Sequence, residues 1–143
     1  MTAPTKLIGE MVSLANLVKP GRAGIITNSY GSILEANAEA AELFNVGSAG
    51  AMRNLLLVSY VHRASVNLFR DGLKQLRACK SFDSKGDIRF RLRGGKGEFK
   101  SLIRSRVIAN GNNIAIMVWE ISDANAIINP SGMYDMKLAS GIK

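Results

Sequence analysis

The chain has 143 residues, which is enough for one domain with a substantial core and short extensions. Hydrophobic residues make up 47% and charged residues 21%, and no apolar run approaches the roughly 20 residues of a membrane-spanning helix, so membrane insertion is not expected. One cysteine, Cys79, and one histidine, His62, exclude an internal disulfide and a His/Cys metal cluster, and the net charge of +8 raises the question of an anionic partner.

An amphipathic helix is predicted within residues 5–19, because apolar side chains recur there at three- and four-residue spacing. Pro20 and Gly21 end it. This pattern is not that of a signal peptide, so we expect a cytoplasmic protein. The N-terminal helix, residues 1–22, is expected either to pack on its own chain or to form a homodimer interface.

Two short strands are predicted at residues 23–28 and 32–36, joined by a turn in which Gly31 can adopt positive φ. Asn37 is then placed to cap a helix that runs to Phe44, because its side-chain oxygen can accept a bond from an unpaired N–H group. A short apolar helix or turn is predicted over residues 51–60. A longer helix follows over about 62–79.

Three further strands are predicted at residues 87–93, 98–109 and 113–122. Strict alternation in the first of them places Ile88, Phe90 and Leu92 on the apolar inner face and arginines on the outer face. A four-residue turn at 94–97 then pairs Leu92 with Phe99, Ile88 with Ile103 and Arg89 with Leu102.

The second turn of this meander is predicted at Asn110-Gly111, a sequence typical of primed hairpin turns. A two-residue turn there places Ile114, Ile116 and Val118 on the inner face and leaves an apolar patch outside, near Leu102. A three-residue turn would reverse this assignment. The patch would need a cover, for which the N-terminal helix of the same chain or of a partner is the candidate. The predicted partner-binding residues are therefore Leu7, Met11, Leu14, Val18, Leu102, Met117, Trp119 and Ile121.

The order of these elements and several local motifs resemble those of PAS domains over residues 23–123, with residues 124–143 as a C-terminal tail. The motifs lie in the opening hairpin, the strand-to-helix junction, the start of the long helix, the third strand and the end of the last strand: 24–31, 35–44, 61–63, 89–93 and 120–122. The resemblance implies an α+β fold with a five-stranded antiparallel sheet in the order 2-1-5-4-3 and helices on one face. A profilin-like or roadblock-type α/β fold is the structural alternative.

The PAS resemblance implies a sensory or regulatory module in signal transduction, which dimerises, can bind a small ligand and regulates a signalling protein partner. Catalysis is not expected, because no nucleophile or paired carboxylates form a recognisable constellation. The apolar inner positions would either line a ligand pocket or simply fill the core. They are Ile26, Leu34, Leu56, Phe69, Leu73, Phe90, Ile103 and Val118.

The two cofactors that the resemblance brings to mind do not fit the sequence. Flavin-binding light sensors carry an Asn-Cys-Arg-Phe motif, which has no counterpart here, and Cys79 lies near the end of the long helix. Haem-binding members ligate iron through a histidine on the long helix, but His62 falls about two turns early, so a capping or surface role is expected. The nature of the ligand or signal is not predicted.

The basic residues are concentrated in the hairpin over residues 89–106, where seven basic residues and Glu98 give +6 of the net +8. One interpretation is an anionic partner, which would be nucleic acid, an acidic protein surface or a membrane surface. The other is that charge protects the edge of the sheet. No aromatic residues interleave on this face, which disfavours single-stranded nucleic acid. The outward residues of this predicted anion patch are Arg89, Arg91, Arg93, Lys100, Arg104 and Arg106.

Overall fold

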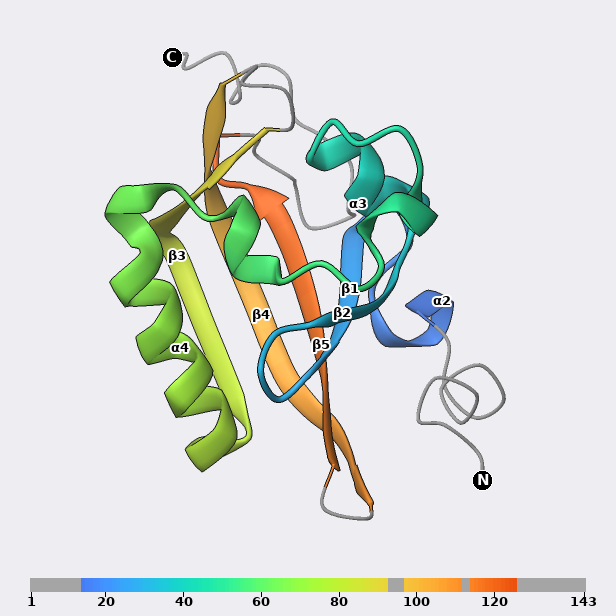
Figure 1. The fold of residues 1–143 in the computed structure, drawn as a ribbon, viewed down its shortest axis with the longest axis vertical. Helices are drawn as coiled ribbons and strands as arrows, with labels where there is room; N and C mark the ends of the chain where they lie inside the picture. The colour runs from blue at the N-terminus through green and yellow to red at the C-terminus, as the bar shows by residue number, and fades with distance from the viewer. Residues whose placement is uncertain (1–13, 93–96, 112–113, 126–143) are drawn as a thin grey trace.

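The protein is a five-stranded antiparallel sheet in the order β2-β1-β5-β4-β3, as predicted (Figure 1). The computed structural model describes residues 14–92, 97–111 and 114–125. The strands are β1 Ala23–Asn28, β2 Ile33–Ala36, β3 Ser81–Arg91, β4 Glu98–Gly111 and β5 Ile114–Asp123. The helices are α2 Leu14–Leu17, α3 Ala38–Leu43 and α4 Val66–Cys79, with 3₁₀ helices η1 Ala49–Met52, η2 Leu57–Tyr60 and η3 Arg63–Ser65. The predicted helix over 5–19 lies mostly outside the described residues.

The opening hairpin and its helix cap form as predicted. Gly31 adopts a φ of +87° in the turn between β1 and β2. The Asn37 side chain is the N-cap of α3, where its Oδ1 accepts hydrogen bonds from the N–H groups of Ala40 and Gly24 at 2.9 and 3.0 Å. Its Nδ2 donates to the carbonyl of Arg22 at 3.0 Å. One side chain thus joins the start of α3 to β1.

The apolar segment after α3 forms two separate 3₁₀ helices, η1 and η2, where one short helix or turn was predicted. The predicted long helix begins as η3 and becomes α-helical at Val66. His62 has the capping role that its position suggested, since its Nδ1 accepts a hydrogen bond from the Ala64 N–H at 3.0 Å. It therefore serves the start of η3.

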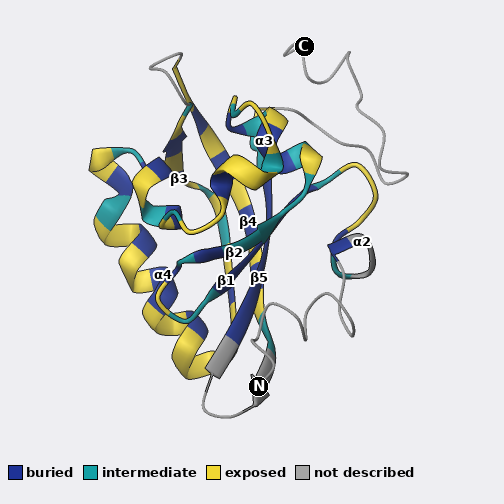
Figure 2. Ribbon diagram, turned by 45° about the vertical axis from the view of Figure 1, so that its right-hand side comes forward, coloured by how far each residue is buried: buried dark blue, intermediate teal, exposed yellow. Residues whose placement is uncertain are grey.

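The main core lies between the sheet and the helices α3 and α4, on what we call the inner face of the sheet. Aromatic rings occupy its centre. Phe69 on α4 stacks on Trp119 of β5 at a centroid distance of 5.4 Å, and Phe44 lies 5.1 Å from both Tyr60 and Phe90. Figure 2 shows buried residues along β1, β5 and the side of α4 that faces the sheet.

The pairing of β3 with β4 differs from the predicted register by two residues at the hairpin end. Phe99 pairs with Phe90 instead of Leu92, and Arg89 pairs with Lys100 instead of Leu102. The strand β3 begins at Ser81, earlier than the predicted residue 87, and contains an irregularity between Lys85 and Arg89. A displacement of two residues keeps each side chain on its predicted face, because strand side chains alternate with a period of two.

The predicted faces of β5 are wrong. Asn110 and Gly111 are not a turn but the last paired residues of β4, opposite Ala115 and Ile114. The register shifts at Ile108, because Val107 pairs with Met117 whereas Ala109 pairs with Ile116. This extra residue is a β-bulge, which reverses the facing of every later pair. Ile116 and Val118 therefore face outward, and Met117, Trp119 and Ile121 belong to the inner core.

Candidate functional site

The outer face of the sheet, away from α4, is covered by α2 at one end. Leu14 and Val18 pack there in a cluster with Ile26, Ile116 and Val118. Close packing requires a small residue on β1: a Cβ at Gly24 would lie 3.0 to 3.1 Å from side-chain atoms of Val18 and Leu14. The N-terminal segment thus contacts the sheet of its own chain, at least over the described residues of α2.

A groove lies on the outer face over β3, β4 and β5. Its volume is about 460 Å³, within the range of small-ligand and peptide sites. The floor includes Leu102, a large apolar residue that is 38% exposed. The walls carry charges of both signs. The lining residues are Arg22, Asp83, Ser84, Lys85, Leu102, Ile103, Arg104, Glu120 and Ser122.

The groove contains a buried carboxylate. Glu120 on β5 is only 7% exposed, and its Oε2 lies 3.6 Å from Arg22 Nη1 without a hydrogen bond to any described residue. The register places Arg104 directly beside Glu120 on β4, and Asp83 beside Arg104 on β3. A row of alternating charge therefore crosses three strands. Such a row can receive a surface that itself carries both signs.

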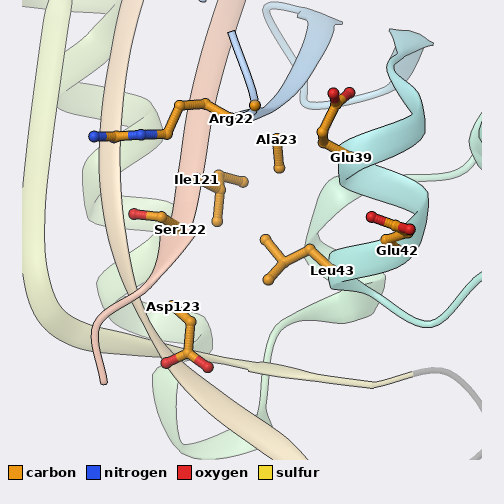
Figure 3. A pocket seen from close by; sticks show the side chains of 9 residues that line it. Arg22, Ala23, Glu39, Glu42, Leu43, Ile121, Ser122 and Asp123 are labelled. Atoms are coloured by element: carbon orange, nitrogen blue, oxygen red, sulfur yellow. The ribbon is translucent and has the colours of Figure 1, made fainter. Parts of the chain in front are cut away.

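A second, smaller pocket lies between α3 and the ends of β1 and β5. Its volume is about 220 Å³. Figure 3 shows Glu39 and Glu42 on α3 across from Ala23 and Ile121, with Arg22 extending away from the helix. Within the described part of the chain, no group of three or more acidic, histidine or cysteine side chains is arranged to hold a metal ion. None of the described helices has the length and apolar character needed to cross a bilayer.

The residues predicted to line an inner pocket do not share one cavity. Phe69, Leu73, Phe90 and Ile103 lie in the inner core. Two of the other residues, Ile26 and Val118, are buried on the outer face, Leu34 packs against that outer cluster, and Leu56 is half-exposed. Not all of the eight residues therefore lie on the inner face as predicted, and for Val118 the reason is the bulge, which reverses the facing of β5.

The predicted partner-binding residues are likewise divided. Leu14, Val18 and Leu102 lie on the outer face, as expected, whereas Leu7 and Met11 are outside the described residues. Met117, Trp119 and Ile121 were predicted to face outward, but they face inward: Trp119 is fully buried, and its Nε1 donates to Thr27 Oγ1 at 2.9 Å. The structure adds Glu120 to this face. Its one sequence signal was an acidic residue in an otherwise apolar strand.

The described residues of the predicted anion patch are exposed, but most of them have partners within the chain. Arg89 lies 3.8 Å from Glu98, Arg91 donates to the carbonyl of Ser59 at 3.2 Å, and Arg106 donates to the carbonyl of Leu17 at 3.0 Å. Arg104 stands between two carboxylates, as described above. Lys100 is exposed, and Arg93 lies outside the described residues. Carboxylates beside Arg89 and Arg104 therefore offset part of the positive charge of the hairpin.

No protein-family model matches this sequence, and no curated protein matches it. Among solved structures, the chain is similar to a PAS domain from a two-component sensor histidine kinase, with 12% identity, a TM-score of 0.60 and coverage of 82% of this chain and 94% of that one. It is also similar to Drosophila melanogaster Cycle PAS-B with bound ethylene glycol, at 12% identity and a TM-score of 0.62. That match covers 71% of this chain and 98% of the other. A third similar structure is the Cronobacter turicensis RpfR quorum-sensing receptor PAS domain in complex with C12:0, at 13% identity and a TM-score of 0.57. That match covers 75% of this chain and 97% of the other. At these identities the likeness is one of fold.

Proposed function

We propose, with the PAS fold of this chain as the premise, that the protein is a regulatory module of signal transduction that acts by docking and not by catalysis. The observation that carries this proposal is the open groove on the outer face, with exposed Leu102 on its floor and a row of both charges beside it. The first partner is a second copy of the same chain. A signalling protein in the cytoplasm would then bind the dimer.

The charge pattern supports self-association. Two copies related by a two-fold axis place the same face against itself, so a face with only one sign of charge would repel its copy. Asp83 and Glu120 supply negative charge, and Lys85 and Arg104 supply positive charge, on the same groove. The helix α2, at one end of this face, would extend the interface.

The test is the association state of a matched pair of variants, measured by sedimentation equilibrium. Leu102→Asp places a charge in the groove, and we expect it to weaken dimerisation at least tenfold, the roughly 1.4 kcal/mol or more that a central apolar contact contributes. Leu68→Asp is the control, since Leu68 is 47% exposed on α4, away from the sheet. A monomeric wild-type protein, or equal weakening by both variants, would contradict the proposal.

A second candidate function, ligand sensing, rests on Tyr60. Its side chain is buried in the inner core beside Phe44, and its hydroxyl has no hydrogen-bond partner among the residues that the structure describes. A buried hydroxyl is normally bonded, so a small ligand that supplies an acceptor would be favoured there. Native mass spectrometry and the mass of any extracted compound test this: a bound compound that Tyr60→Phe releases supports the proposal, and a ligand-free spectrum contradicts it.

The alternative proposal, an anionic partner on hairpin 89–106, is the weaker one because carboxylates already lie beside two of its arginines, Glu98 beside Arg89 and both Asp83 and Glu120 beside Arg104. Charge reversal at Arg89, Arg91 and Arg93 should abolish any salt-sensitive binding by this hairpin. Unchanged binding would exclude the hairpin as the site.

A further inference from the structure

A straight row of basic side chains runs along α4, outside the site described above. Arg70, Lys74 and Arg77 follow one another at spacings of four and three residues, which return to the same side of a helix. Arg63 lies in η3, three residues before the first residue of α4, at the end from which the row starts. All four residues are exposed. From Arg70 to Arg77 the row extends about 10 Å along the helix.

The charges of this row are largely unpaired. The side chains of Arg63, Arg70 and Lys74 have no ion-pair or hydrogen-bond partner among the described residues, whereas those of Arg89 and Arg91 in the hairpin do. Asp71, the one acidic residue of α4, lies roughly 100° around the helix from Arg70. Arg77 donates one hydrogen bond, to the carbonyl of Ser29 at 2.8 Å, and a guanidinium has four further N–H groups. The row therefore remains available to an anion.

The hydrogen bond of Arg77 also connects the basic row to a turn that carries an aromatic residue. Ser29 belongs to the turn between β1 and β2, and this turn packs on α4, because a Cβ at Gly31 would lie 3.8 Å from Leu73 Cδ1. Tyr30 lies between Ser29 and Gly31 in the chain, and its side chain is 79% exposed. Asn28 holds the turn by accepting the Tyr30 N–H at 2.9 Å. The structure thus places an exposed aromatic residue directly after the residue that Arg77 contacts.

We propose that the basic row, together with Tyr30, binds single-stranded nucleic acid. The four cations would contact successive phosphates of an extended strand, and a base would stack on the Tyr30 ring. A membrane fits less well, because Leu68, the exposed large apolar residue of α4, lies on the other flank of the helix, roughly 160° from Arg70. A duplex fits less well because its bases are already stacked. An exposed aromatic ring is a platform for unstacked bases.

The test is fluorescence anisotropy of the full chain with a labelled oligo(dT) of about 12 nucleotides, at several salt concentrations. Four phosphate contacts predict that log K falls against log salt with a slope of roughly −3 for a single strand. Arg70→Glu and Lys74→Glu should each weaken binding about tenfold and make the slope shallower by about 1. Lys19→Glu, also exposed, changes the net charge equally and should leave binding within about twofold.

The aromatic contribution is tested at Tyr30 with the same oligonucleotide. Tyr30→Ala should weaken binding by about 5- to 150-fold, the equivalent of 1–3 kcal/mol for one stacked base, and Tyr30→Phe should bind like the wild type. An exposed side chain can be changed without loss of folding. Undetectable binding, equal losses in Lys19→Glu and Lys74→Glu, or equally effective competition by poly-glutamate or anionic lipid vesicles would each overturn the proposal.

Discussion

Two substitutions of Asn37 should distinguish how much its side-chain oxygen and its side-chain nitrogen contribute to stability. The oxygen accepts two hydrogen bonds and the nitrogen donates one. Asn37→Ala removes the cap of α3, which costs about 1 kcal/mol, and leaves the N–H of buried Gly24 without its acceptor, which costs a further 1–3 kcal/mol. We expect a loss of about 3 kcal/mol in the free energy of unfolding. With a urea m-value near 1.5 kcal/mol/M, the midpoint should fall by about 2 M.

The matched variant is Asn37→Asp. A carboxylate retains both acceptor bonds and suits a helix N-terminus, but its second oxygen loses the bond to the Arg22 carbonyl and is repelled by it, at a cost of about 1–2 kcal/mol, which is still below that of Asn37→Ala. Asn67→Ala, at an exposed position of α4, should change stability by less than about 0.5 kcal/mol. If Asn37→Asp proved as damaging as Asn37→Ala, or if Asn37→Ala cost under about 1 kcal/mol, the assignment of Oδ1 as the main link would be refuted.

Three further substitutions test the inner core by thermal or urea unfolding. Gly72→Ala should destabilise by about 1–2 kcal/mol, because its Cβ would lie 2.5 to 2.9 Å from ring atoms of Phe82 and the helix propensity of alanine offsets only about 1 kcal/mol; a higher melting temperature would contradict this. Thr27→Val should cost about 1–3 kcal/mol by leaving the buried Trp119 N–H unpaired. Thr27→Ser keeps the acceptor and should cost less. Tyr60→Phe should be neutral or stabilise by up to about 1 kcal/mol, since its hydroxyl is unbonded among the described residues; a clear loss would mean that the hydroxyl is bonded in solution.

Local chemistry in the sequence was sufficient for several elements. Asn37 caps α3 because an amide side chain after a short strand can reach unpaired N–H groups, and Gly31 turns the chain because it tolerates positive φ. The prediction that Ile88 and Phe90 face inward is confirmed. It succeeded because arginines alternate with apolar residues along this strand, and only one face can be buried. The cap, the turn and the facing of β3 each depend on residues that lie close together in the sequence.

The candidate groove could not be derived in the same way. Its Glu120 becomes meaningful only when Arg104 and Asp83 stand beside it on two other strands. The basic row was visible as charges off the buried stripe of a helix, but its link to Tyr30 depends on the turn that packs against α4. Such juxtapositions join residues far apart in the chain, and no local period records them.

The last strand shows most clearly where sequence patterns stop. Met117, Val118, Trp119 and Ile121 are all buried, so β5 is apolar on both faces and its own alternation does not say which side is inside. The assignment then depends on pairing with β4, and the one extra residue at Ile108 reverses it. Bulge and facing are set by packing: the Trp119 ring stacks on Phe69 and bonds to Thr27 only in this register. The local periods of the chain select its strands and caps, whereas the contacts between distant strands select their faces.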